Sequence, residues 1–333
     1  MYHSRFGSPH YNAGLKYGLK LKNNRKYIDE KLKLINAEMM DFGIKSSLIC
    51  KKEYPEFLDE LKGISDGLKV DLSYFSSFIF CMYNFMFNNY CSCFAFKDCE
   101  NIIYGRNSDY LVEFKNVCDS CYYHLDNSYS FVGNTTAMSE IEDGVNEYGF
   151  AVGLTFVYPS LINPGLNSGV IVRNLLEKCR DVNEGIEKIK NLTISSSQNI
   201  LMADKNGDMA LVECNCEKIN IIRPKNNFLC CSNDFNSIKM KKYSCSIEDE
   251  IHSRERYRTM YNFLLKQKKC SFEYASSLLK GKYGFMCDYD KHSKMDTLWS
   301  SVYVLNKNEV YICDGNPKRK IYKMDKRLKY KEL

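Results

Sequence analysis

The segment Tyr90 to Asp109, YCSCFAFKDCENIIYGRNSD, gathers residue types that nucleophilic chemistry needs. Cys91 begins a strand-like run directly after a helical pattern. Thiol–imidazole enzymes generally set their cysteine at a helix N-terminus and need a dedicated histidine. The five histidines of the chain, at positions 3, 10, 124, 252 and 292, lie in no evident motif. If cleavage between Tyr90 and Cys91 made the cysteine a chain terminus, its own α-amine, with a pKa of roughly 7.7–8.0, would be a base beside the thiol.

Other chemistry-bearing patterns in the sequence are weaker. The one CxxC, Cys118 to Cys121, has no second CxxC at the spacing of a zinc site, so we expect no metal and no cofactor. A thiol protease would require His124 or His292 beside a sulfur. The sixteen cysteines are scattered through a long chain, so we expect most to be reduced and buried.

Composition and charge exclude several function classes. The 333 residues carry a net charge of +6, split as +3 in residues 1–90 and +3 in residues 91–333, so neither part is a concentrated nucleic-acid surface. No run of eighteen apolar residues predicts a membrane span, and the N-terminus lacks the apolar core of a secretory signal, so we expect a cytoplasmic protein. The basic tail, residues 318–331, is a solvated end or a contact for an anion-bearing partner.

The elements that would position Cys91 fall into two regimes. Before residue 90 the apolar residues recur at helical spacing, as in residues 55–68 with Pro55 in the first turn. Asp71 can cap a further helix whose apolar stripe runs from Leu72 to Phe85, and an earlier helix is expected over residues 24–40. We interpret residues 1–90 as a bundle of helices whose apolar faces must pack against another part of the protein.

After residue 90 the periodicity becomes that of strands. Residues 92–96 and 102–104 predict paired strands, and residues 200–203 and 209–214 flank a turn with Asn206-Gly207. A third hairpin is expected over residues 302–313, with helical patterns at 170–179, 183–189, 257–265 and 272–279. Blocks of antiparallel strands followed by blocks of helices predict an α+β fold rather than a parallel doubly wound sheet.

The motif CSCFAF…GRNSD resembles the start of the mature chain in the penicillin acyltransferase-like and choloylglycine hydrolase-like families, N-terminal-nucleophile (Ntn) hydrolases of the self-processing cysteine type. FGSPHYNAGLKYG, YPEFLDELKGISDGLKVDLSYF, NEYGFAVGLTF, CSNDF, SRERY and TLWSSVYVL…DGNP match in order, so the resemblance covers nearly the whole chain. It implies a four-layer αββα sandwich with two packed antiparallel sheets over residues 91–333. Residues 1–90 would be a helical pre-sequence, cleaved but still associated.

Carried over residue by residue, the resemblance implies a set of catalytic roles. Cys91 is the nucleophile, Arg106 favours its thiolate, and Asp109 orients the freed amine. Asn233 donates to the oxyanion together with the backbone N–H of Thr155, and Arg256 completes the charged network.

Alternatives to two of these roles remain. Arg254 is the alternative to Arg256. We favour Arg256 because it puts Tyr257, Met260 and Phe263 on the apolar face expected of the following helix. Cys93 is the alternative nucleophile, although the motif aligns on Cys91.

The implied reaction is acyl transfer through a thioester on Cys91, from an amide or from a coenzyme A or carrier-protein thioester to an amine or water. Two positions depart from the families. Tyr90 stands where relatives with a pre-sequence usually have Gly, which predicts slower self-cleavage. Thr155 stands where bile-salt hydrolases carry Asn, which argues against a sterol substrate. The rival interpretation is an unprocessed, non-catalytic binding or scaffold protein of the same fold.

Overall fold

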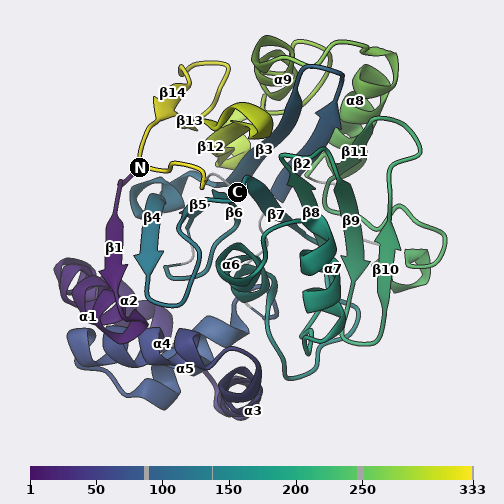
Figure 1. The fold of residues 1–333 in the computed structure, drawn as a ribbon. Coiled ribbons are helices and arrows are strands. Elements are labelled where there is room, and N and C mark those ends of the chain that lie inside the picture. The colour runs from purple at the N-terminus through teal and green to yellow at the C-terminus, as the bar shows by residue number, and fades with distance from the viewer. Residues whose placement is uncertain (86–89, 137, 246–250, 332–333) are drawn as a thin grey trace.

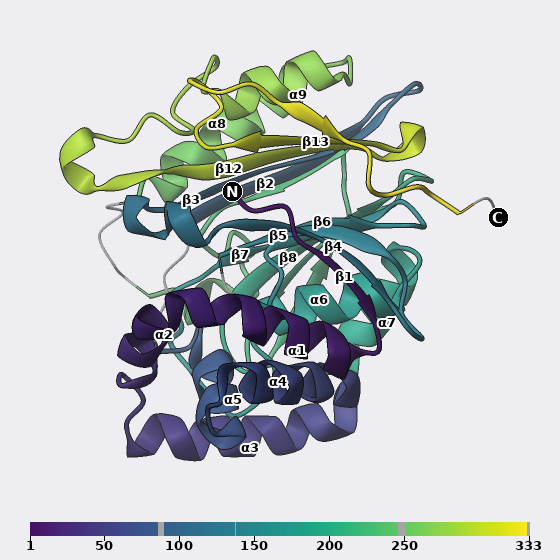
Figure 2. The ribbon, with the colours of Figure 1, turned by 90° about the vertical axis from the view of Figure 1, so that its left-hand side faces the viewer.

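The computed structural model describes residues 1–85, 90–136, 138–245 and 251–331. Two sheets lie face to face between layers of helices (Figures 1 and 2). The first sheet has eight strands, in the spatial order β1 (Arg5–Ser8), β4 (Asp119–Leu125), β5 (Phe131–Thr135), β6 (Asp143–Asn146), β7 (Phe150–Phe156), β8 (Gln198–Asp204), β9 (Met209–Cys214) and β10 (Ile219–Ile222). The second has six, in the order β11 (Phe228–Cys231), β2 (Tyr90–Lys97), β3 (Ile102–Leu111), β12 (Met295–Val304), β13 (Glu309–Asp314) and β14 (Lys323–Asp325).

The helices cover the outer faces of both sheets. α6 (Ser168–Lys178) and α7 (Val182–Lys190) lie against the eight-stranded sheet, and α8 (Ser253–Lys266) and α9 (Phe272–Leu279) against the six-stranded one. Separate apolar cores fill the space between the sheets and the space between each sheet and its helices. This arrangement confirms the predicted α+β sandwich with two packed sheets.

Strand β2 shows how the sequence produces these layers. Successive side chains of a strand point to opposite faces. Cys93 and Ala95 accordingly join the core between the sheets, while Phe94 and Phe96 join the core under α8 and α9. Both faces of β2 are buried, so its apolar residues are nearly continuous.

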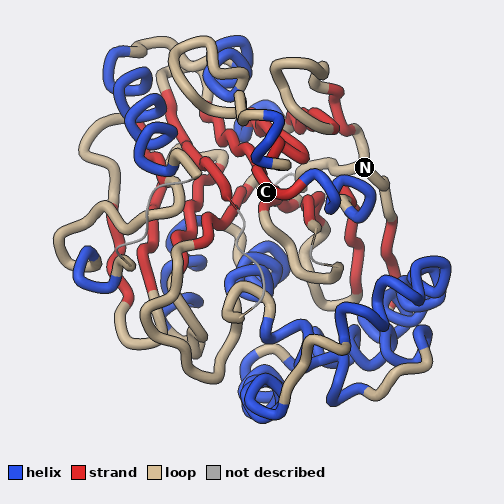
Figure 3. The backbone as a smooth tube through the Cα atoms, turned by 180° about the vertical axis from the view of Figure 1, so that it is seen from behind, coloured by secondary structure: helices blue, strands red, loops and turns tan. Residues whose placement is uncertain are grey.

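Residues 1–85 contribute α1 (His10–Leu21), α2 (Arg25–Leu32), α3 (Ala37–Glu53), α4 (Pro55–Leu68) and α5 (Leu72–Cys81). Seen from behind, these helices gather at one corner of the molecule (Figure 3). The cap of α5 is confirmed, since the Asp71 side chain accepts a hydrogen bond from the backbone N–H of Tyr74 (3.0 Å). Within the described residues, no helix is long and apolar enough to cross a membrane.

Two helical predictions were wrong at their boundaries. The single helix expected over residues 24–40 is two helices, because Asn36 adopts an extended conformation and its side chain caps the start of α3 through the N–H of Met39 (2.9 Å). The helix expected to continue to Phe85 ends at Cys81, where the backbone of Met82 becomes extended. At Asn36, a capping side chain inside an apolar pattern therefore overrides the helical periodicity.

The close approach of α1 and α4 depends on glycines. A Cβ atom on Gly14 would lie 2.0 Å from the carbonyl oxygen of Glu60, and one on Gly18 would lie 2.3 Å from that of Ile64. Gly63 and Gly67 of α4 face α1 in the same way, since a Cβ atom on them would lie 2.1 Å and 2.7 Å from backbone oxygens of α1. The two helices are thus in backbone contact along the spacing Gly-x-x-x-Gly that each contains.

The helices before residue 85 are not a separate bundle, because β1 joins the eight-stranded sheet. Its residues Arg5 to Ser8 pair in parallel with Tyr122 to Leu125 of β4. This strand was not predicted. Four residues with one buried apolar side chain, Phe6, give no periodicity to detect.

A buried ionic network also joins the two parts of the chain. The guanidinium of Arg173 in α6 donates to Glu60 of α4 (2.7 Å) and to Glu177 (2.5 Å), and it lies over the ring of Tyr123 at 3.7 Å. His10 of α1 contacts the other oxygen of Glu177 (2.9 Å). These polar groups are all at least nine-tenths buried, so removing one would leave a buried charge without its partner.

Candidate active site

Cys91 is the second residue of β2, which lies between β11 and β3 in the interior of the six-stranded sheet. Its side chain is fully buried. The sulfur accepts a hydrogen bond from Nη2 of Arg106 on the neighbouring strand β3, at 2.8 Å. The paired strands therefore bring together the cysteine and the arginine that the motif predicted.

The Arg106 guanidinium is fixed on several sides. Nη2 also donates to Glu142 (3.2 Å), Nη1 donates to Asp143 (3.1 Å), and Nε donates to the carbonyl of Leu154 (3.2 Å). Burial raises the pKa of the Cys91 thiol well above its ordinary value, while the positive charge of Arg106 opposes this effect. The sulfur is therefore a buried thiol held against a fixed cation.

Glu142 and Asp143, which hold Arg106, were missed from the sequence. They precede NEYG in SEIEDGVNEYG, where an acidic pair looks like part of a turn. Trp299 is fully buried, and its indole N–H donates to Asp143 (2.9 Å). Asn146 ends β6, and its side-chain oxygen accepts from the N–H of Tyr148 in the turn that follows (3.0 Å).

The backbone of Cys91 is held by Asn233 and Arg256. The Cys91 N–H donates to Oδ1 of Asn233 (3.0 Å), and Nη1 of Arg256 donates to the Cys91 carbonyl (2.6 Å). Nη2 of Arg256 also donates to Oδ1 of Asn233 (2.8 Å). Arg254 instead lies largely exposed, with Nε 3.7 Å from a carboxylate oxygen of Asp234. The structure thus brings Arg256, and not Arg254, to Cys91.

The two residues assigned to the oxyanion lie on the same side of the site. Nδ2 of Asn233 donates to the carbonyl of Phe156 (2.7 Å), the residue that follows Thr155 in β7. The Thr155 hydroxyl donates to the carbonyl of Ser232 (2.5 Å), the residue before Asn233. These two hydrogen bonds join the end of β7 to the segment after β11. Thr155 and Asn233, the residues expected to bind an oxyanion, therefore lie close together.

Asp109 lies opposite Tyr90 in the β2–β3 register. Its carboxylate accepts hydrogen bonds from Thr297 (2.5 Å) and Tyr289 (2.9 Å), and it lies 4.0 Å from Nη1 of Arg256. Burial raises the pKa of this carboxyl to about 6, although Arg256 and the two hydroxyls favour the ionised form. Tyr289 was missed because nothing in its sequence context, CDYDKH, marks it.

The alternative nucleophile and bases lie in different surroundings. Cys93 pairs across strands with Cys231. Burial would raise the pKa of Cys93, but hydrogen bonding to Cys231 and the charge of Arg106 hold it below its ordinary value. His124 contacts the Ser130 hydroxyl (2.8 Å), and His292 is exposed. In the described part of the chain, no group of three or more His, Cys, Asp or Glu side chains could hold a metal ion.

Solved structures of other proteins resemble this chain at low sequence identity. The chain resembles a conjugated bile acid hydrolase from Clostridium perfringens at a TM-score of 0.50 and 12% identity, over 73% of this chain and 98% of that one. A penicillin V acylase from Agrobacterium tumefaciens gives 0.47 and 12% over 73% and 100% of the two chains. The N-acylethanolamine-hydrolyzing acid amidase ortholog of Caenorhabditis elegans gives 0.48 and 15% over 65% and 93%. No curated protein sequence matches the chain.

The family comparison covers the larger part of the sequence. Residues 95–319 match the family described as acyl-coenzyme A:6-aminopenicillanic acid acyl-transferase. The match includes Arg106, Asp109, Thr155, Asn233 and Arg256 and begins four residues after Cys91. With the paired sheets and the site built on β2 and β3, it confirms the expected relationship: the chain belongs to the acyl-coenzyme A:6-aminopenicillanic acid acyl-transferase family, whose fold is that of Ntn acyltransferases and amidohydrolases.

Proposed function

We propose that this protein is a self-processing cysteine acyltransferase or amidohydrolase that forms a thioester on Cys91. One observation carries the proposal: a fully buried cysteine at the start of a strand has a fixed arginine 2.8 Å from its sulfur and an asparagine oxygen 3.0 Å from its backbone nitrogen. The sulfur and the nitrogen that would become the base are thus each held by a separate side chain.

The first reaction is cleavage of the chain itself. The Cys91 sulfur attacks the carbonyl carbon of Tyr90, and the C–N bond breaks as the Cys91 nitrogen takes up a proton. Water then hydrolyses the resulting thioester and leaves a carboxylate on Tyr90 and a free amine and thiol on Cys91. Arg256 donates to the Cys91 carbonyl and so fixes the backbone beside the bond to be cut.

The second reaction uses the new terminus. The α-amine takes the proton of the Cys91 thiol, and the thiolate attacks the acyl carbonyl of an amide or thioester. The amine then returns the proton to the leaving group, and water or a second amine removes the acyl group from sulfur. In this proposal Asp109 orients the amine, and Asn233 with the Thr155 backbone N–H stabilises the oxyanion. Asn233 would exchange its present contact with the Phe156 carbonyl for one with the substrate.

The partners are a small acyl donor, either an amide or a coenzyme A or carrier-protein thioester, and an amine or water as acceptor. We further propose that residues 1–90 stay bound to residues 91–333 after cleavage. We also propose a cytoplasmic location, where the sixteen cysteines would stay reduced.

Intact mass and N-terminal sequencing of the purified protein test self-cleavage. We expect two fragments, residues 1–90 and residues 91–333, the second beginning with Cys91. The Cys91→Ala variant should stay intact, whereas Cys93→Ala should still be cut. A cut Cys91→Ala protein, or an uncut wild type that does not react with thiol reagents, would favour the non-catalytic scaffold.

A further inference from the structure

Cys93 and Cys231 stand directly opposite each other on neighbouring strands, since the register of β2 and β11 pairs their Cα atoms. Opposite residues of an antiparallel pair have Cα atoms about 4.5–5.5 Å apart. A disulfide joins Cα atoms that are about 4.4–6.8 Å apart. Both side chains are fully buried in the core between the two sheets. The fold therefore holds two thiols at the separation that a disulfide needs.

The two sulfurs differ in their readiness to ionise. On its other side Cys93 stands opposite Arg106 of β3. Burial would raise the pKa of Cys93, but a hydrogen bond from the Cys231 thiol and the charge of Arg106 hold it below its ordinary value. Burial and the neighbouring Cys93 sulfur raise the pKa of Cys231 well above its ordinary value. A thiol that ionises readily beside a second cysteine is the arrangement that oxidants convert to a disulfide.

Strand β11 offers the route by which a small oxidant reaches the pair. It is the outermost strand of the six-stranded sheet and has only four residues, of which Cys231 is the last. A short strand at the edge of a sheet opens locally at a much lower free energy than the whole domain unfolds. Such an opening would expose both sulfurs and leave the other strands paired.

The pair is connected to the candidate active site through both strands. Cys93 follows the candidate nucleophile by two residues, and Cys231 precedes Asn233 by two. The Cys93 sulfur lies 3.7 Å from the carbonyl oxygen of Leu154, which also accepts from Nε of Arg106 (3.2 Å). Opposite residues have Cβ atoms about 4.5–5.5 Å apart, whereas those of a disulfide are about 3.8 Å apart. A bond between the sulfurs would therefore pull the two strands together beside the residues that hold the nucleophile.

We propose that Cys93 and Cys231 form a redox site, a pair of thiols that a peroxide converts to a disulfide, and that the disulfide slows acylation of Cys91. The ionised Cys93 sulfur attacks one peroxide oxygen, the O–O bond breaks, and the leaving hydroxide takes up the proton that Cys93 gave up. The Cys231 sulfur then attacks the sulfenic acid on Cys93, so that an S–S bond forms and a second water leaves. Two thiols and one hydrogen peroxide thus give one disulfide and two waters, and a dithiol reductant reverses the change.

The effect on acylation rests on the proposed function, whereas formation of the disulfide needs no chemistry at Cys91. Mass spectrometry of unreduced peptides from peroxide-treated Cys91→Ala protein tests the redox site. We expect one pair of peptides joined through Cys93 and Cys231, lighter by two hydrogens than the separate peptides and released by dithiothreitol. Cys230→Ala should form the same disulfide, because the Cys230 side chain lies in the core under α8 and α9.

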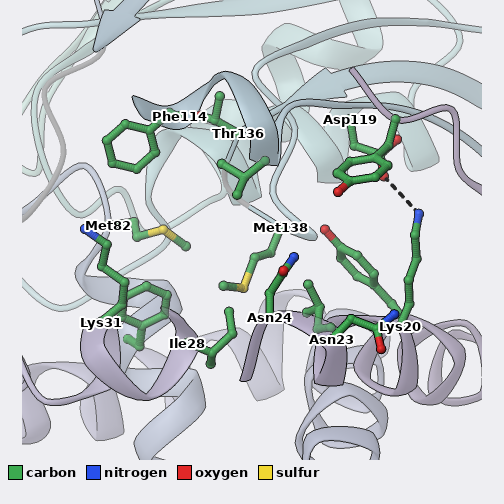
Figure 4. Close-up of a pocket in the computed structure, with 15 residues that line it drawn as sticks. Lys20, Asn23, Asn24, Ile28, Lys31, Met82, Phe114, Asp119, Thr136 and Met138 are labelled. Carbon is green, nitrogen blue, oxygen red and sulfur yellow. Dashed lines mark ion pairs between the residues drawn. The ribbon is translucent and has the colours of Figure 1, made fainter. Parts of the chain in front are cut away.

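Two methionines report whether the peroxide has entered the folded protein. Met82 and Met138 line a cavity of about 160 Å³ between the helices before residue 85 and the sheet domain, and their sulfur atoms point into it (Figure 4). A thioether takes up one oxygen to become a sulfoxide. The peroxide concentration is therefore raised until both methionines are sulfoxides. If Cys93 and Cys231 were still free thiols at that point, the inference would be overturned.

Single-turnover acylation by an activated ester measures the effect on the proposed reaction. The disulfide is formed with diamide, which joins pairs of thiols, and its presence is confirmed by mass. We expect oxidation to slow acylation of the wild type at least about tenfold, because a displacement of about 1 Å in an active site costs about a hundredfold. Dithiothreitol should restore the rate.

The variants Cys93→Ala and Cys231→Ala separate this effect from oxidation of the nucleophile itself. Neither can form the disulfide, so each should keep its own rate after treatment with diamide. An equal loss of rate in the wild type and both variants would refute the effect of the disulfide on acylation. A protein that forms the disulfide but is never acylated, even when reduced, would refute the proposed function and leave the redox site in place.

Discussion

Asn233 contacts the backbone on both sides of the candidate site. Its oxygen accepts from the Cys91 nitrogen, and its nitrogen donates to the Phe156 carbonyl. If its nitrogen turns to a substrate oxyanion, it interacts more strongly with the tetrahedral state than with the ground state. Asn233→Ala should then lower turnover by a factor of about a hundred to a thousand, the usual effect of removing one oxyanion donor, and change substrate affinity much less.

Single-turnover acylation of Cys91, compared with the steady-state rate, measures this effect. Asn236→Ala is a matched control, because that asparagine lies three residues further along and its side-chain nitrogen donates to the Asp234 carbonyl (3.4 Å), away from Cys91. Normal acylation in Asn233→Ala would mean that the residue holds the backbone and has no part in the oxyanion hole.

Asp109 gives the site a charge that changes near neutral pH. Because burial raises its pKa to about 6, the carboxyl is neutral below that pH and ionised above it. The proposed role needs the negative charge, and the Cys91 amine must lose a proton with a pKa of roughly 7.7–8.0. Activity should therefore rise between about pH 6 and 8, with apparent values that belong to the coupled groups.

A pH–rate profile of kcat/KM checks this prediction. Asp109→Asn should impair self-cleavage and turnover and remove the lower part of the rising limb. The variants His124→Gln and His292→Gln should keep the whole limb. Loss of the limb in either histidine variant would indicate an imidazole base instead of the α-amine.

At the scale of elements, the contact of α1 with α4 leaves no space for a side chain at its glycines. A Cβ on Gly18 would lie 2.3 Å from the Ile64 carbonyl oxygen and 3.0 Å from the Cα of Gly67. Gly18→Ala must therefore push the helices apart, which we expect to lower the free energy of unfolding by about 1–3 kcal/mol, the usual cost of overpacking.

Urea unfolding of the Cys91→Ala protein measures that loss. Gly7→Ala is the control, because its Cβ would meet a single backbone oxygen at an ordinary 3.5 Å. If Gly18→Ala were as stable as Gly7→Ala, the helices would have room to separate and the Gly-x-x-x-Gly spacing would have no role in packing.

The sequence predicted the elements whose signal is local. The hairpin of β2 and β3 follows from alternation and a polar turn, and the start of α5 follows from Asp71. It could not predict β1, because a four-residue strand is defined by a partner more than a hundred residues away. Likewise Arg106 and Asp109 came from a motif, while Glu142 and Tyr289 enter the site only through tertiary contacts.

At the scale of the whole molecule, many contacts join residues 1–90 to the rest. Besides the Arg173 network, Nδ2 of Asn167 donates to the carbonyls of Ile79 (2.9 Å) and Met82 (3.2 Å). The two fragments expected from self-cleavage should therefore elute together from a gel-filtration column and separate only in denaturant.

Arg173→Met should weaken that association. The substitution leaves Glu60 and Glu177 buried without the arginine. This should lower the free energy of association of the two fragments by about 3–5 kcal/mol, so they should separate at a lower urea concentration. Lys178→Met at the same interface is the control, because its ion pair with Glu56 is partly exposed and such pairs contribute about 0–1 kcal/mol. Equal effects of the two variants would show that the buried network does not hold the fragments together.

If the protein is cut after Tyr90, as we propose, strand β1 gains a second role. It is the outermost strand of its sheet, and its parallel pairing satisfies the N–H and C=O groups along one side of β4. Without residues 1–90, that row of groups would face solvent and could recruit a strand from another molecule. The pre-sequence would then protect the mature enzyme from aggregation for as long as the enzyme exists, which is the role of a permanent intramolecular chaperone.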